Sequence, residues 1–156
     1  MKATVTLIVP CYNEEESLPF FYNAVCDVAR QLPDYGISLL LVNDGSKDGT
    51  LKVMRELAAR DERVQYLSFS RNFGKEAAMY AGFCNAKGDY VAVMDADMQD
   101  PPSLLPEMLG ILEQGEYDSV ATRRVTRKGE PPIRSWFARI CLILLNLTVE
   151  ASAVEK

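Results

Sequence analysis

Three closely spaced aspartates follow an apolar run in the second half of the chain. Asp95, Asp97 and Asp100 come directly after Tyr90–Met94, a run whose length and composition predict a strand. Carboxylates crowded at a strand end repel one another unless a cation lies between them. Carboxylate and amide oxygens suit Mg²⁺ or Mn²⁺, and Mg²⁺ typically takes one or two carboxylates while phosphates and waters complete its shell. The position therefore predicts a metal site that serves a diphosphate, although an Asp-x-Asp pair also arises by chance.

The composition excludes several common kinds of catalytic site. The chain has 156 residues, 48% of them hydrophobic, which suffices for one sizeable core. It contains no histidine, so Ser/His and Cys/His nucleophiles and the commonest zinc ligand are excluded. Its four cysteines form no C-x-x-C pair, which indicates neither zinc nor a disulfide framework and is typical of a reducing compartment. Because Met1–Thr4 enters a strand-like run without a signal-peptide pattern, we expect a cytoplasmic location.

Charge is distributed unevenly along the chain. Residues 1–118 carry 10 basic and 19 acidic side chains, whereas residues 119–156 carry 7 basic and 3 acidic ones. The basic cluster of the C-terminal part comprises Arg123, Arg124, Arg127, Lys128, Arg134 and Arg139. It suits a phosphate or an anionic membrane surface, and a solvated charged face is the alternative. The apolar run Trp136–Val149 is shorter than the ~20 residues needed to span a bilayer, so it predicts an interfacial helix or an amphipathic helix closing the domain.

Strand-like and helical patterns alternate along the chain. The predicted strands are Thr4–Val9, Ile37–Val42, Val64–Phe69, Tyr90–Met94 and Asp118–Thr122. The predicted helices are Glu15–Leu32, Thr50–Arg60, Lys75–Ala86 and Ser103–Gln114. Asn13 is expected to cap the first helix, and Asp100, which two prolines follow, is expected to cap the last. The alternation predicts one α/β fold with a mostly parallel sheet, right-handed crossovers and helices on both faces.

Polar side chains gather where the predicted strands end, which is where parallel sheets bind their ligands. Tyr12 can lie flat against a base, Asp44 can accept hydrogen bonds from a base or ribose, and Lys75 or Arg71 can neutralise phosphate. The chain has neither a Walker A loop nor a G-x-G-x-x-G fingerprint, so ATPase and dinucleotide functions are excluded. These parts describe a nucleoside diphosphate site, although each loop taken singly also reads as a turn or a helix cap.

Four ordered motifs resemble the successive motifs of family 2 glycosyltransferases. They are Val9–Glu15, Val42–Thr50, Ser70–Glu76 and Asp95–Pro102. The likeness extends over nearly the whole chain and is greatest to the polyprenyl-phosphate branch, which includes bactoprenol glucosyltransferases and dolichyl-phosphate mannose synthases. It implies a GT-A fold, a nucleotide-sugar donor, and Mg²⁺ or Mn²⁺ held by Asp95, Asp97 and Gln99. The donor-binding residues that it implies are Pro10, Tyr12, Glu14, Asp44, Lys75 and Asp95, and the catalytic ones are Asp97 and Arg123.

The resemblance also implies a reaction. It is an inverting, metal-dependent transfer of a hexose from a nucleotide sugar, UDP-glucose before GDP-mannose, to a polyprenyl phosphate. A phosphate monoester with a second pKa near ~6 is already an anion at neutral pH, so it needs little base catalysis, which suits a site without histidine.

The same resemblance divides the chain into two parts. We expect residues 1–122 to form the donor-binding core and residues 123–156 an acceptor-side segment, shorter than the family's, on the inner face of the membrane. One alternative is a nucleotide-sugar-binding domain without efficient transfer, and another, outside the family, is an Asp-x-Asp phosphohydrolase. Nucleic acid is not an expected partner, and a homo-oligomer remains open.

Overall fold

The computed structural model describes residues 2–122, and residues 1 and 123–156 lie outside this description. One compact unit spans Met1–Ala121. Its elements, in chain order, are β1 (Ala3–Cys11), α1 (Ser17–Gln31), β2 (Tyr35–Asn43), α2 (Thr50–Arg60), β3 (Val64–Ser68), α3 (Lys75–Asn85), β4 (Tyr90–Val93), the 3₁₀ helix η1 (Pro102–Leu104) and α4 (Leu105–Glu113). The basic cluster of the C-terminal part and the apolar run Trp136–Val149, with the roles predicted for them, therefore fall outside the described residues.

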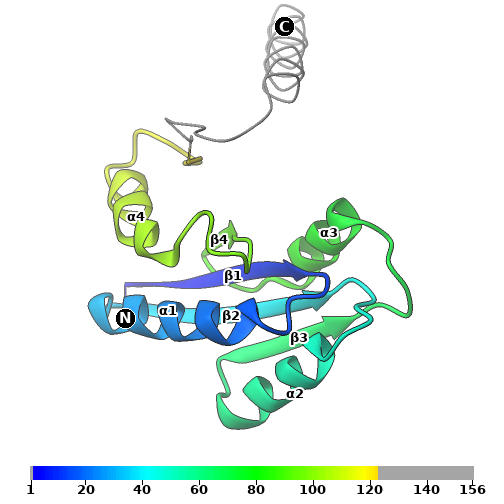
Figure 1. The fold of residues 1–156 in the computed structure, drawn as a ribbon. Coiled ribbons are helices and arrows are strands. Elements are labelled where there is room, and N and C mark those ends of the chain that lie inside the picture. The colour runs from blue at the N-terminus through cyan, green and yellow to red at the C-terminus, as the bar shows by residue number, and fades with distance from the viewer. Residues whose placement is uncertain (1, 123–156) are drawn as a thin grey trace, which may run out of the picture. The chain divides into compact units, whose positions relative to one another are not determined.

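A parallel sheet forms the centre of this unit. Strand β1 pairs with both β2 and β4, and β2 pairs with β3, in the order β3-β2-β1-β4. Helices α1, α2 and α4 contribute buried residues to one face of the sheet, and α3 covers the other (Figure 1). The α/β fold predicted from the sequence, with a parallel sheet and helices on both faces, is confirmed.

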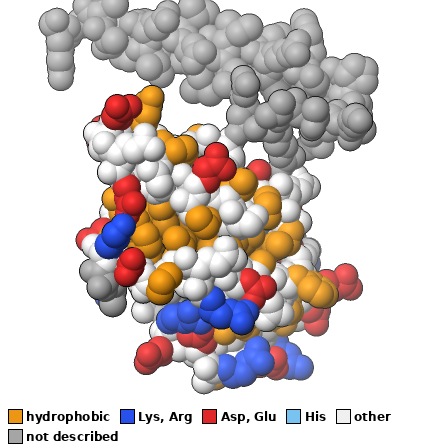
Figure 2. Space-filling view, turned by 90° about the vertical axis from the view of Figure 1, so that its left-hand side faces the viewer, with side chains coloured by type: hydrophobic (Ala, Val, Ile, Leu, Met, Phe, Trp, Pro, Cys, Tyr) orange, Lys and Arg blue, Asp and Glu red, His pale blue; other side chains and the backbone are white. Residues whose placement is uncertain are grey.

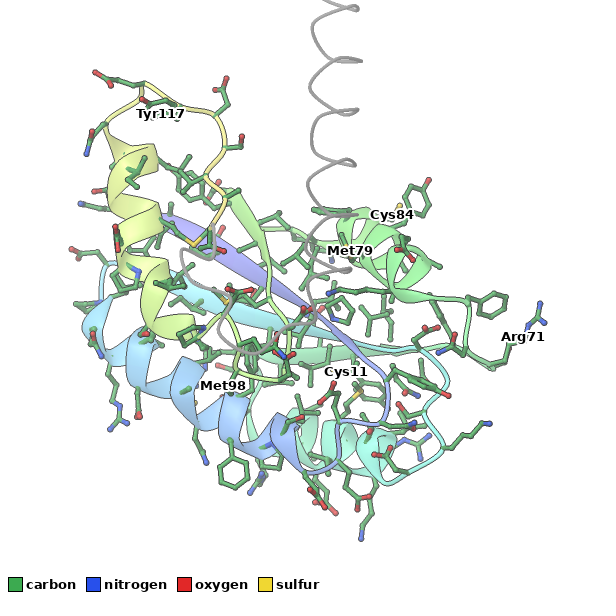
Figure 3. The ribbon with its side chains drawn as sticks, turned by 45° about the horizontal axis from the view of Figure 1, so that its top comes forward. Cys11, Arg71, Met79, Cys84, Met98 and Tyr117 are labelled. Carbon is green, nitrogen blue, oxygen red and sulfur yellow. The ribbon has the colours of Figure 1, made fainter. Side chains whose placement is uncertain are left out.

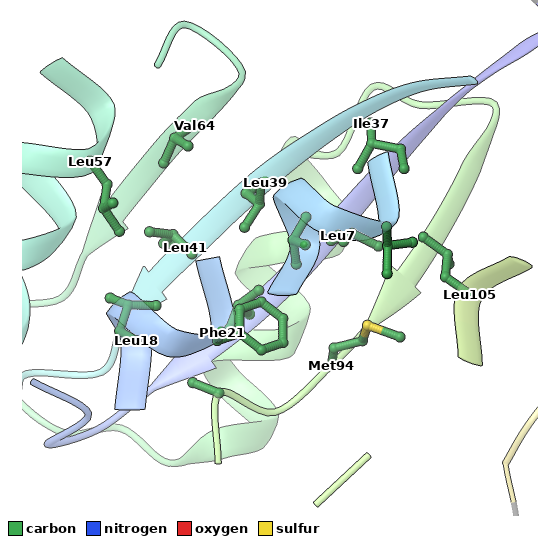
Figure 4. Close-up of a cluster of buried hydrophobic side chains, with 14 of the residues drawn as sticks. Leu7, Leu18, Phe21, Ile37, Leu39, Leu41, Leu57, Val64, Met94 and Leu105 are labelled. Atoms are coloured by element: carbon green, nitrogen blue, oxygen red, sulfur yellow. The ribbon is translucent and has the colours of Figure 1, made fainter. Parts of the chain in front are cut away.

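The main core lies between the sheet and the helices α1, α2 and α4. Alternate residues of a strand point to the same face, and Leu7 of β1 and Leu41 of β2 are fully buried on this one (Figure 4). Helix α1 also buries an apolar face, which comprises Leu18, Phe21, Val25 and Val28. Burial of each large apolar side chain contributes about 1.5–3 kcal/mol, so this face fixes α1 against the sheet.

The opposite face of the sheet carries a smaller buried cluster. It consists of Ile8, Leu40 and Val42 from the strands and Ala78 from α3. Helix α3 approaches β1 closely because it has a glycine at the contact: a Cβ on Gly82 would lie 2.3 Å from Ile8 Cγ2. This close packing fixes the position of α3 and of the loop that precedes it.

Polar contacts tie α4 to the amino-terminal ends of the strands. The Tyr35 hydroxyl donates to the Glu113 carboxylate, and Lys2 Nζ lies 3.1 Å from Glu113 Oε1. The Tyr35 and Lys2 hydrogen bonds hold the pKa of Glu113 below its usual range, and the bond to Glu113 raises the pKa of Tyr35 to about 12. Figure 2 views the molecule from this end and shows acidic and basic side chains interspersed with exposed hydrophobic ones.

Three local predictions are wrong. Residues 118–122 form no strand, because among the described residues no neighbouring strand pairs with this mostly exposed segment. Asn13 does not cap α1: it adopts a left-handed φ of 58°, and its side chain accepts a hydrogen bond from the Lys47 N–H instead. Asp100 does not cap the last helical segment, because Pro101 occupies the position before the first helical residue.

Candidate active site

The parallel strands bring their polar loops to one edge of the sheet. The four strands of the described residues point the same way, so the segments that follow them emerge together at the carboxyl edge. The helix between β1 and β2 lies on one face, whereas the helix between β3 and β4 lies on the other. The chain therefore reverses its winding between β1 and β4, and ligands of such sheets bind outside this switch point.

A cleft of 460 Å³ lies at this point. Its lining residues are Pro10, Cys11, Tyr12, Glu14, Asp44, Asn72, Gly74, Lys75, Asp95, Ala96 and Asp97. The structure thus brings together every donor-binding residue predicted from the sequence, and Asp97 with them. Gln99 does not belong to this lining, and Arg123 lies outside the described residues. The roles predicted for all of these residues stay predictions.

Asp44 joins two of the loops around the cleft. The residue is 3% exposed, and its carboxylate accepts hydrogen bonds from the Phe73 N–H at 2.7 Å and the Gly74 N–H at 3.0 Å. These donors lie just before α3, where the helix dipole favours negative charge. The neighbouring Gly45 has a φ of 64°, and a Cβ there would lie 2.2 Å from the Arg71 carbonyl carbon. The two loops therefore form one tightly packed support for the residues that follow them.

The loop after β1 is held by the loop after β2. The Glu14 N–H donates to Thr50 Oγ1 at 2.7 Å, and the Ser17 hydroxyl donates to the Glu14 carboxylate. Asp48 accepts hydrogen bonds from the Thr50 N–H at 3.0 Å and from the Glu15 N–H at 3.2 Å. Although partial burial opposes its charge, the hydrogen bonds from Thr50 and Glu15 hold the pKa of Asp48 below its usual range. This network places Glu14 at the cleft.

The acidic residues after β4 face a lysine from α3. Lys75 Nζ lies 2.7 Å from Asp95 Oδ2, and both side chains are partly exposed, at 52% and 37%. Asp97 Oδ1 accepts the Gln99 N–H at 2.9 Å, an Asx turn that orients its carboxylate. Within residues 2–122, no group of three or more His, Cys, Asp or Glu side chains could hold a metal ion. Two carboxylates fit Mg²⁺ or Mn²⁺ nonetheless, because these ions take the rest of their ligands from phosphates and water.

The aromatic and basic residues of the loops around the cleft differ in where they point. Tyr12 is 41% exposed and lines the cleft, where its ring offers a flat surface for a base. Arg71 does not line the cleft: its guanidinium lies 4.6 Å from the centre of the Phe73 ring, and Figure 3 shows it projecting away from the body. Of the two cations proposed to neutralise phosphate, the structure therefore places Lys75 at the cleft.

Four of the lining residues were not predicted from the sequence, namely Cys11, Asn72, Gly74 and Ala96. They belong to the same loops, so their neighbours in the motifs were the available signal. Cys11, at the end of β1 (Figure 3), is 1% exposed and donates to the Val9 carbonyl at 3.3 Å. Burial, with Glu14 and Asp95 nearby, raises the pKa of its thiol far above the usual range. A neutral buried thiol is a poor nucleophile, so Cys11 serves packing rather than covalent catalysis.

Comparison with known sequences connects this cleft to an enzyme family. The sequence model described as Glycosyl transferase family 2 matches residues 6–150. The chain is 36% identical over 150 residues to the prophage bactoprenol glucosyl transferase homolog of Escherichia coli, covering 94% of this chain and 48% of that protein. It is 38% identical over 146 residues to the undecaprenyl-phosphate 4-deoxy-4-formamido-L-arabinose transferase of Proteus mirabilis, covering 93% and 43%. The chain thus spans less than half the length of these relatives.

Solved structures share the fold. The mannosyltransferase PcManGT of Pyrobaculum calidifontis, in complex with GDP-Man and Mn²⁺, matches with a TM-score of 0.53 and 26% identity, over 62% of this chain and 28% of that one. The S. aureus TarS 1-349 structure matches with a TM-score of 0.63 and 20% identity, over 82% and 38%. The predicted GT-A fold is confirmed by these neighbours.

No helix within the described residues is long and apolar enough to cross a membrane.

Proposed function

The chain belongs to glycosyl transferase family 2, and we propose that it binds a nucleotide sugar in the cleft and transfers the sugar to a polyprenyl phosphate. The observation that carries this proposal is the convergence of Tyr12, Asp44, Lys75, Asp95 and Asp97 on one cleft. Its volume falls within the ~300–1,000 Å³ range of small-molecule sites. The relatives named for bactoprenol and undecaprenyl phosphate support the acceptor class.

Different cleft residues bind different parts of the donor. Tyr12 stacks on the base, and Glu14 and Asp44 accept hydrogen bonds from base or ribose hydroxyls and N–H groups. Lys75 provides a positive charge for the diphosphate. We favour UDP-glucose as donor, with GDP-mannose next, because glucosyl transfer is named among the relatives and GDP-Man among the solved neighbours.

Asp95 and Asp97 would hold a divalent ion. The Mn²⁺ in the mannosyltransferase neighbour supports this. The ion would stabilise the negative charge of the departing nucleoside diphosphate. The two carboxylates follow the short strand β4, whose register with β1 is fixed from Val5–Tyr90 to Ile8–Val93. Their position relative to Tyr12 and Glu14 is therefore set by the sheet, and Gln99 is the third proposed ligand.

The transfer needs little from a protein base. An acceptor phosphate is ionised at neutral pH, since its second pKa is near ~6. It can displace the diphosphate from the opposite side of the sugar, which inverts the anomeric centre. We assign the orientation of the sugar and acceptor phosphate to Asp97 and Arg123.

The membrane contact belongs to residues 123–149 in this proposal. Their positive charge suits an anionic membrane surface on the cytoplasmic side, and salt would weaken the contact by screening. Co-sedimentation with vesicles containing anionic lipid tests this. Equal sedimentation of the chain and of a variant whose six clustered basic residues are changed to Gln would contradict the assignment.

Calorimetry with UDP-glucose and GDP-mannose is the direct test of donor binding. With Mn²⁺ present we expect the donor to bind. A chelator or Asp97→Ala should weaken the donor affinity by about ten-fold or more, because mutation of residues that merely support metal ligands already costs ~10-fold in metal affinity. Asp34→Ala, an exposed aspartate outside the cleft, is the matched control. Equal affinity with and without chelator would refute the metal proposal.

A transfer assay separates the enzyme from the alternative. Radiolabelled sugar entering a lipid-extractable product at enzyme-like rates of ~1–1,000 per second supports the transferase. Donor binding without lipid product supports a nucleotide-sugar-binding domain that lacks efficient transfer.

A further inference from the structure

Lys75 is the cleft residue whose contact the proposed donor site does not explain. It begins α3, and its Nζ lies 2.7 Å from Asp95 Oδ2. The hydrogen bonds from Phe73 and Gly74 to Asp44 fix the chain directly before it. The ammonium group is thus held against one of the two carboxylates that would bind the metal.

This ion pair opposes metal binding in the free protein. A divalent ion ligated by Asp95 would share its carboxylate with an ammonium group a few ångströms away, and like charges repel strongly at that range. Lysine is a flexible cation with four methylenes, and this side chain is 52% exposed. Its head group can therefore leave Asp95 without disturbing α3 once a better anion is present.

A nucleoside diphosphate provides that anion. Its phosphates carry more than one negative charge and accept hydrogen bonds from an ammonium group as well as a carboxylate does. When they enter the cleft, Lys75 can turn to them and leave both oxygens of Asp95 to the metal. Metal and nucleotide would then each strengthen the binding of the other, because such coupling is reciprocal.

We propose that Lys75 is a positioning residue that neutralises Asp95 in the free protein and makes binding of the divalent ion depend on the nucleoside diphosphate. The proposal rests on the proposed function. It differs from simple phosphate binding because it assigns Lys75 an unfavourable effect on the metal in the absence of nucleotide.

The test measures Mn²⁺ affinity by electron paramagnetic resonance, with and without UDP, in the full chain. Lys75→Met keeps an unbranched side chain one atom shorter than lysine and removes its charge. In the absence of UDP we expect this variant to bind Mn²⁺ about 3- to 10-fold more tightly than the unchanged protein, because an exposed ion pair and a nearby repulsion are both removed. UDP should raise the Mn²⁺ affinity of the unchanged protein more than that of the variant.

Three further variants separate the charge of Lys75 from its packing. Lys75→Gln should reproduce the effect of Lys75→Met, and Lys75→Arg, which keeps the charge, should bind Mn²⁺ within about two-fold of the unchanged protein. Lys52→Met is the matched control, because Lys52 is an exposed lysine of α2 that does not line the cleft.

The outcomes distinguish failure of this proposal from failure of the proposed metal-dependent function. If the unchanged protein binds no Mn²⁺ even with UDP, the metal-dependent function fails and the present proposal fails with it. If the unchanged protein binds Mn²⁺ with UDP, but loss of the charge leaves nucleotide-free Mn²⁺ affinity equal or weaker, the function stands and the role of Lys75 is refuted. An unchanged effect of UDP in Lys75→Met would also overturn it.

Discussion

Replacing Asp44 by Asn tests the link between the two loops that support the cleft. Asp44 is buried and accepts the Phe73 and Gly74 N–H groups. An asparagine offers one oxygen to one of these donors and turns its own N–H₂ group toward the other. The substitution therefore leaves one backbone donor unpaired and removes the negative charge at the start of α3.

The magnitude follows from these two losses. An unpaired buried donor costs about 1–3 kcal/mol, and lost charge at a helix N-terminus costs about 0.3–1 kcal/mol. We therefore expect the free energy of unfolding to fall by about 2 kcal/mol. For a domain of this size, about 4 °C per kcal/mol gives a fall in Tm of about 8 °C.

Chemical denaturation and calorimetry measure this change, and hydrogen exchange locates it. The amides of Phe73 and Gly74 should lose protection in Asp44→Asn, while those of β1 keep theirs relative to the global stability. Asp27→Asn is the control, because Asp27 is exposed and its partner among the described residues is Arg30 on the same helix. If Asp44→Asn lies within about 0.5 kcal/mol of this control, the size expected of ordinary surface substitutions, Asp44 does not hold the loops together.

Two further substitutions test the body of the fold. The hydrogen bond from Arg63, with that from Tyr22, holds the pKa of Asp61 well below its usual range. Because the pKa is lower in the folded than in the unfolded protein, ionised Asp61 stabilises the fold above the unfolded pKa of ~3.9. This contribution is lost as the pH falls below that value. Asp61→Asn should therefore lower stability at pH 7 by about 1–3 kcal/mol, and a difference in denaturation midpoint that does not narrow below pH ~4 contradicts this assignment. Gly82→Ala crowds Ile8 and should cost about 1–3 kcal/mol more than Gly110→Ala in α4, where no atom of the described residues lies within 4 Å of an added Cβ. Equal thermal stability of the two alanine variants would show that α3 can move away from β1.

Local patterns in the sequence determine most of the elements and the edge of the sheet at which the polar loops lie. The helical spacing of Leu18, Phe21, Val25, Val28 and Leu32 predicts one apolar face of the first helix. The first four residues are buried in α1, whereas Leu32 follows the helix and is partly buried. The bounds predicted for α2 are those observed. Strict alternation of strands and helices requires a parallel sheet, whose strand ends share one edge. Polar residues after successive strands therefore lie along the same edge, whatever the order of the strands.

Only the tertiary structure decides which of these residues touch. The strand order β3-β2-β1-β4 places the loop after β2 against the loop before α3, so Asp44 binds the Phe73 and Gly74 amides. It also places the start of α3 beside the end of β4, which pairs Lys75 with Asp95. Composition and periodicity carry no information on strand order, because every order gives the same alternation along the chain. Composition also gives no information on pairing. The segment 118–122 therefore has a strand-like sequence, although no strand among the described residues pairs with it.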